Sequence, residues 1–257
     1  MANWAAFPYA GDYNFDATSV KKSWSRLHSG DLEPLPGLTD LLQAWAHFHN
    51  GEFQKASALG LSLGTVGLNV ANKSVCVYAS YLEKHEARRL ALFQEVAERA
   101  EAHIAQDPTN FNARYLRAFA LARYSQGISV AKALAQGLGT KIKTDLESVI
   151  RQQPNHLEAH VALGSFHAEV IDKVGSLIGA MAYGVNKDTG LNLFTQAVKL
   201  NMHSAFCMVE YANAMLMLGG EEMMKEASRM FQLAARAKPV DAAERLEVEM
   251  AKSELMD

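Results

Sequence analysis

The apolar residues of the chain recur at the spacing of helices and not at that of strands. Ala, Leu, Met, Glu and Lys dominate, and runs that alternate apolar with polar residues and are rich in β-branched side chains do not appear. Comparison of the chain with itself aligns three segments, each a polar turn that opens a helix: 107–113, 153–159 and 201–207. A turn that recurs in this way predicts an all-α chain built from repeated helix pairs, because one pair cannot bury its apolar face alone.

Small and large residues stand at fixed places around these turns. The residues that carry the pattern are Leu163, Gly164, Ala118, Ala212, Gly219, Ala227, Phe231 and Pro239. They resemble the tetratricopeptide repeat, which has Leu-Gly and a small residue on its first helix, Gly at the turn, Ala and Phe on its second helix, and a closing Pro. The resemblance implies a right-handed superhelix of antiparallel helical hairpins, a TPR-like α-solenoid.

The spacing of the repeats departs from the family period of about 34 residues. Pro108 and Pro154 are 46 residues apart, Pro154 and Met202 are 48 apart, and Met202 and Pro239 are 37 apart. The two long spacings contain apolar segments rich in small residues, near 128–139 and 174–185, that carry almost no charge. We expect these insertions to line a pocket or to form an interface, because exposed apolar patches of this kind usually mark binding surfaces.

The pattern divides the chain into an N-terminal arm with a short helix, 1–36, and a repeat domain, 37–257. Asp16 is expected to cap the short helix, which carries Val20 and Trp24 on one face. The arm is expected either to pack on the first hairpin or to reach a neighbouring subunit. About five hairpins are expected between 37 and 240, followed by a capping helix that begins at Ala242 behind Asp241.

Composition narrows the function classes. The chain has 257 residues with a net charge of −3, and its 25 basic and 28 acidic residues do not favour nucleic-acid binding. The two cysteines cannot form a disulfide framework. No window has the apolar length of a membrane span, and residues 1–20 lack the pattern of a signal peptide. We therefore expect a cytoplasmic protein.

Candidate catalytic and metal-binding residues are weak. His156, His160 and His167 can share one helical face, as zinc ligands do, but two of them fall on aromatic packing positions of the repeat. Cys76 and Cys207 lie in apolar contexts typical of inert thiols. The sequence has no Gly-x-Ser-x-Gly elbow and no Gly-Lys-Ser/Thr motif. We expect no catalytic residues, no metal and no cofactor.

The resemblance implies where a partner would bind. In the family, fixed places on the first helix of each repeat face the concave groove. Carried onto this chain they are Asn112, Tyr115, Phe119, Arg123, Glu158, Val161, Ser165, Glu169, Phe206, Val209, Asn213 and Met217. The Lys and Asn of the family's carboxylate clamp are replaced by Tyr115 and Phe119, by Val161 and Ser165, and by Val209 and Asn213. The mixed aromatic, aliphatic and amide surface favours an apolar peptide or a small amphipathic ligand over an acidic tail.

Two functions follow. The first is a non-enzymatic adaptor or scaffold that binds a protein or peptide in its concave groove. The alternative is an accessory protein of a transporter that binds a small apolar or amphipathic ligand. The stretch from Leu163 to about Leu246 resembles the T component associated with TRAP transporters in residues 163–169, in the apolar glycine-containing insertion and in residues 211–213. The uncharged insertions also predict a homo-oligomer.

Overall fold

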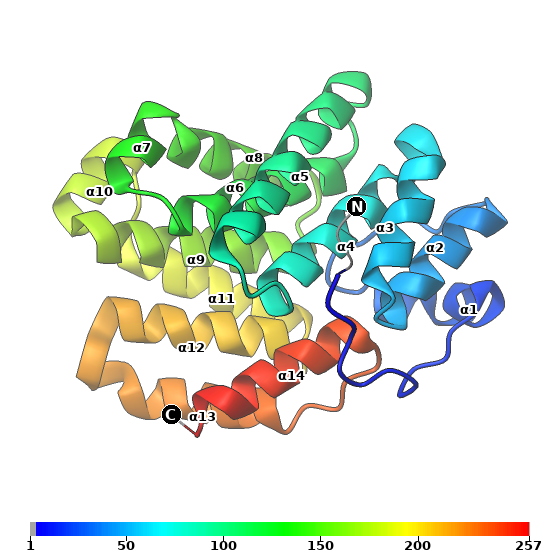
Figure 1. Ribbon diagram of the computed structural model, residues 1–257. Coiled ribbons are helices and arrows are strands. Elements are labelled where there is room, and N and C mark those ends of the chain that lie inside the picture. The colour runs from blue at the N-terminus through cyan, green and yellow to red at the C-terminus, as the bar shows by residue number, and fades with distance from the viewer. Residues whose placement is uncertain (1–3, 257) are drawn as a thin grey trace. The chain divides into compact units, whose positions relative to one another are not determined.

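The computed structural model describes residues 4–256, and in this part of the chain helices are joined by turns without any strand (Figure 1). The predicted all-α helical-repeat fold is confirmed. Five pairs of helices follow one another in the described residues, and each pair consists of a first and a second helix of one repeat. The pairs are α2 (Thr39–His49) with α3 (Phe53–Ser62), α4 (Leu68–Tyr81) with α5 (Glu86–Gln106), α6 (Phe111–Gln126) with α8 (Leu138–Gln152), α9 (Leu157–Val174) with α11 (Lys187–Leu200), and α12 (Ala205–Gly219) with α13 (Met224–Ala235).

The remaining helices lie outside these pairs. They are α1 (Ala17–Leu27) before the first pair, α7 (Val130–Ala135) and α10 (Ser176–Tyr183) inside the third and fourth, α14 (Ala242–Glu254) after the last, and two short 3-10 helices, η1 (Gly64–Gly67) and η2 (Gly220–Met223). The two apolar insertions therefore form short helices. Gly175 and Gly184 set the limits of α10, since both adopt positive φ angles, 82° and 64°, that glycine tolerates best.

The chain divides into two compact units. The first unit comprises residues up to 28, 32–145 and 240–243, and the second comprises 29–31, 146–239 and the residues from 244 onward. Helices α8 and α14 each contribute to both. The division into an arm of 1–36 and one repeat domain of 37–257 therefore stays a prediction.

The N-terminal arm packs on the first hairpin. Asp16 caps α1 as predicted, accepting a hydrogen bond from the backbone N–H of Ser19 at 2.7 Å. Trp24 on α1 is buried and meets Trp45 on α2 edge to face, with ring centroids 6.0 Å apart. Phe7 is buried in the same unit. Of the two expected roles for the arm, packing on the first hairpin is the one observed.

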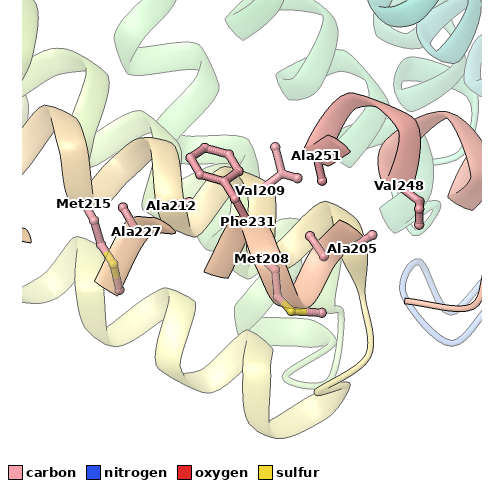
Figure 2. Packing of buried hydrophobic residues seen from close by; sticks show 10 residues of the cluster. Ala205, Met208, Val209, Ala212, Met215, Ala227, Phe231, Val248 and Ala251 are labelled. Atoms are coloured by element: carbon pink, nitrogen blue, oxygen red, sulfur yellow. The ribbon is translucent and has the colours of Figure 1, made fainter. Parts of the chain in front are cut away.

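Small residues and one large ring build the core of the last hairpin. Figure 2 shows Phe231 of α13 in a cluster with residues of α12 and α14. The buried members are Ala205, Met208, Val209, Ala212, Met215, Ala227, Phe231, Ala234, Val248 and Ala251. The alanines let the helices approach each other, and the large side chains fill the remaining space.

Candidate partner-binding surface

The N-terminal ends of α4 and α6 in the first unit are contacted by Glu33, which lies in the segment between α1 and α2. Asn69 and Asn112 are the second residues of these two helices. The Asn69 side-chain amide donates to both carboxylate oxygens of Glu33 at 3.0 Å, and that of Asn112 donates to Glu33 Oε2 at 2.5 Å. The Trp24 indole N–H donates to the backbone carbonyl of Glu33 at 2.8 Å. The Asn112 amide, a predicted groove residue, is thus engaged by Glu33.

The other predicted residues of α6 form a short aromatic and cationic row. Tyr115 is buried, with 4% of its surface exposed, while Phe119 and Arg123 are half-buried. The ring centroids of Tyr115 and Phe119 are 6.0 Å apart, and the Arg123 guanidinium lies 5.1 Å from the centre of the Phe119 ring. Of this helix, Phe119 and Arg123 retain surface that a partner could contact.

In the second unit, the first turn of α9 is again covered by the chain itself. The backbone N–H of Glu158, the second residue of α9, donates to the carbonyl of Gly30 at 3.1 Å. Val161 is buried, whereas Ser165 and Glu169 are half-buried. The hydroxyl of Ser165 donates to Glu210 Oε2 at 3.0 Å and so links α9 to α12. Glu210 is absent from the predicted set because it lies one place beyond the family's groove positions.

Helix α12 presents the most accessible predicted residues. Val209 is buried with 3% of its surface exposed, Phe206 and Asn213 are half-buried, and Met217 is exposed at 39%. Phe206, Asn213 and Met217 follow at intervals of seven and four residues, which places them on one side of the helix. This side combines an aromatic ring, an amide and a thioether.

The three histidines of α9 and its N-cap form hydrogen bonds to backbone groups through their ring nitrogens. His156 Nδ1 accepts from the Ala159 N–H at 3.1 Å, and His167 Nδ1 accepts from the Asn186 N–H at 3.0 Å. His160 Nε2 lies 2.8 Å from the carbonyl oxygen of Pro154 and donates to it. Among residues 4–256, no group of three or more His, Cys, Asp or Glu side chains has the geometry to hold a metal ion.

The cysteines are buried thiols. Burial, with a smaller contribution from the charge of Glu210, raises the pKa of Cys207 to about 12. Because the thiolate is the reactive form of cysteine, this environment disfavours nucleophilic chemistry at Cys207. Cys76 is buried as well. Over the described part of the chain, no helix is long and apolar enough to cross a membrane.

Comparisons with known proteins bear on the fold. No family model matches the chain, and no curated protein matches it. A solved structure that is similar is TTC0263, described as a thermophilic TPR protein of Thermus thermophilus. The two share 17% sequence identity with a TM-score of 0.58, over 83% of this chain and 97% of that one. The resemblance of residues 163–169 and 211–213 to the T component stays a prediction. The helix pairs and this similarity together give the chain a tetratricopeptide-repeat-like fold.

Proposed function

We propose that this protein is a non-enzymatic interaction scaffold that binds a protein or peptide partner. The partner would contact the inner face of α12, defined here as the side that carries Phe206, Asn213 and Met217, and the second half of α9 around Ser165 and Glu169. The helical-repeat fold supports the general role, because such repeats present extended surfaces to partners. The observation that carries the finer proposal is the accessibility of Phe206, Asn213 and Met217 on one side of α12, where Met217 is 39% exposed.

The first unit is less suited to bind a partner at its predicted positions. The Asn112 amide is engaged by Glu33, and Tyr115 is buried. A partner would have to remove the chain's own segment before it could contact Asn112. On α12, by contrast, a half-buried ring can anchor an apolar side chain and the amide of Asn213 can hydrogen-bond to an extended peptide backbone.

The experiment is affinity capture with the full-length chain as bait in an extract of its native cells, followed by a binding titration with each purified candidate. The test variant is Asn213→Ala with Met217→Ala. The matched control is Gln196→Ala with Lys199→Ala, which changes two exposed side chains of the second-helix element α11.

A partner whose affinity falls at least tenfold in the α12 variant, and is unchanged in the α11 variant, supports the proposal. A partner that both variants bind as tightly as the unmodified chain places the contact elsewhere. Tyr115→Ala is unsuitable as a test, because truncating a buried ring would destabilise the first unit and so mimic a binding defect.

The exposed face of α10 supports the predicted self-association. Leu177, Ile178 and Met181 are exposed at 75%, 60% and 82%, and the segment 174–186 has no charged residue. An apolar surface of this kind favours contact with another protein surface. Light scattering is expected to give the mass of an oligomer for the unmodified chain and that of a monomer for Ile178→Glu. A monomer in both would exclude this role for α10. The small apolar ligand, the transporter role and the cytoplasmic location stay predictions.

A further inference from the structure

The Glu33 carboxylate lies at the N-terminal ends of two helices of the first unit at once. Both of its oxygens accept from the Asn69 amide on α4, and Oε2 also accepts from the Asn112 amide on α6. Because the backbone N–H groups at a helix N-terminus favour negative charge, the two helices add to the attraction that the amides provide. The two amides and the first turns of α4 and α6 are called the carboxylate site below.

The carboxylate site is held in place by contacts that do not involve Glu33. The Asn69 amide also donates to Asn110 Oδ1 at 3.2 Å, and Asn110 caps α6 by accepting from the backbone N–H of Ala113 at 2.9 Å. Asn69 and Asn112 are 5% and 7% exposed. Two nearly buried amides from different helices, one of them fixed by a helix cap, form a preorganised site for a charged acceptor.

The segment that carries Glu33, residues 32–38, is called the strap below. Its three leucines are 38% to 55% exposed, so their burial contributes little to holding it. Its prolines, Pro34 and Pro36, have no backbone N–H to donate. The Trp24 indole N–H donates to the backbone carbonyl of Glu33 at 2.8 Å. The strap is therefore held by polar contacts at Glu33 more than by apolar packing.

The backbone of the strap is strained beside Glu33. Among residues 4–256, Leu32 is the only residue other than glycine with a positive φ angle, 51°. A left-handed backbone is costly for a residue with a Cβ, and such strain persists only where neighbouring contacts hold it, as in ligand clamps and switch segments. Here the neighbouring contacts are those of Glu33. Release of the Glu33 carboxylate would let Leu32 relax, and this favours departure of the strap.

We propose that the carboxylate site recognises an extended acidic segment of a partner protein, and that the strap occupies the site as an internal substitute until the partner displaces it. The strap itself supplies the chemistry that fits: a glutamate followed by a proline, in a segment whose apolar side chains stay available for other contacts. The partner gains the two amide contacts, and the strain at Leu32 is relieved. This second site lies in the first unit and does not require that any partner binds α12.

The direct test is a binding titration with a labelled synthetic peptide that has the sequence of residues 30–38. The peptide is added to the full-length unmodified chain, to Glu33→Ala, and to the control Glu98→Ala, which changes an exposed carboxylate on α5. Because an internal segment competes at high effective concentration, Glu33→Ala should bind the peptide at least about tenfold more tightly than the other two chains. A further Asn112→Ala change should remove this gain.

The matched control peptide carries Gln in place of Glu33. It should bind the Glu33→Ala chain at least about tenfold more weakly, because hydrogen bonds to a charged acceptor are the stronger ones. Equal binding of the two peptides, or equal binding by the Glu33→Ala and unmodified chains, overturns the proposal. Light scattering of Glu33→Ala mixed with the unmodified chain should show no particle larger than either forms alone. A larger particle would assign the site to the strap of a second copy and overturn the proposal of a different partner.

A second measurement uses the unmodified chain and does not depend on whether any variant folds. The chain is labelled with ¹⁵N and mixed with about 10 mM unlabelled peptide, since a tethered segment acts at millimolar effective concentration. The indole N–H signal of Trp24 should shift, because displacement of the strap breaks its hydrogen bond to the Glu33 carbonyl. The Gln peptide should leave the signal in place. A signal that neither peptide moves, or that both move equally, shows that the strap is a permanent part of the fold and overturns the proposal.

Discussion

Gly164 on α9 lies directly against the ring of Phe194 on α11. A Cβ at position 164 would be 2.7 Å from Phe194 Cε2, closer than real Cβ contacts come. Phe194 is fully buried, so its ring cannot move into solvent. The contact explains why the first helix of this repeat carries Leu163-Gly164: the glycine leaves room for the ring of the second helix.

We therefore expect Gly164→Ala to lower the free energy of unfolding by about 1–3 kcal/mol, because overpacking a buried contact costs more than the better helix propensity of alanine returns. Urea denaturation measures the change. Gly37→Ala is the control, since a Cβ there meets no atom within 4 Å. A stabilised Gly164→Ala would show that the two helices are not held this close.

Removal of the Asn112 amide should loosen the N-terminal segment. Asn112→Ala removes one of the two side-chain amides that donate to Glu33 Oε2, while the amide of Asn69 remains, and hydrogen bonds to charged groups contribute about 1.5–3 kcal/mol. We expect a loss of about 2 kcal/mol in urea denaturation and faster limited proteolysis within residues 29–38. Asn213→Ala, which removes an accessible amide from α12, should change the free energy by less than about 0.5 kcal/mol. Equal effects of the two variants would contradict the role assigned to Glu33.

The buried ion pair of the first unit should matter far more than an exposed one. Asp145 accepts two hydrogen bonds from Arg117, both at 2.7 Å, and its side chain is 2% exposed. The hydrogen bond with Asp145 raises the pKa of Arg117, although burial opposes the shift. Asp145→Asn should cost about 3 kcal/mol of unfolding free energy, because it removes the buried counter-charge of a partly buried guanidinium and leaves only the exposed carboxylate of Glu101, 3.6 Å away.

The matched control for this pair is Glu226→Gln on α13. Glu226 pairs with Arg229 at 3.3 Å, and the two side chains are 47% and 68% exposed. An exposed pair contributes about 0–1 kcal/mol. A cost for Asp145→Asn no larger than that for Glu226→Gln would show that the Arg117–Asp145 contact is not formed in solution.

The carboxylate of Glu83 should make stability depend on pH. Burial pushes its pKa upward, but the backbone N–H of His85, the hydroxyl of Tyr78 and the Arg88 guanidinium outweigh burial, so the pKa lies below its ordinary value. A lowered pKa means that the carboxylate stabilises the fold above the unfolded pKa of about 4.3, and that this contribution is lost as pH falls.

Glu83→Gln should therefore lower the free energy of unfolding by about 1–2 kcal/mol at about pH 7, and the difference from the unmodified chain should shrink at about pH 3.5. Urea denaturation at the two pH values gives both numbers. A difference that stays constant between these two conditions would show that Glu83 does not have a lowered pKa.

The repeat architecture could be predicted from the sequence because its signals are local. A turn such as 107–113 and a small residue such as Ala212 recur at a period set by one helix pair, and Asp16 caps the helix that it immediately precedes. The two apolar insertions were visible for the same reason, since each is one continuous segment.

The accessibility of the candidate site could not be predicted in this way. The family places assign Asn112 to the inner face of its helix, but its engagement depends on Glu33, 79 residues earlier in the chain. Tyr115 occupies a family place that was expected to face a partner, yet the surrounding residues of the fold leave only 4% of its surface exposed. Contacts of this range leave no periodic trace, so the predicted set of residues includes buried and engaged members along with accessible ones.

The central claim is that a partner binds the inner face of α12 in the second unit. Hydrogen–deuterium exchange of the full-length chain, with and without a captured and purified partner, tests it most directly. The account predicts that the partner slows exchange in residues 205–219 and in the second half of α9, and leaves α11 and α13 unchanged. Slowed exchange confined to α11 and α13, or to the first unit, would contradict it.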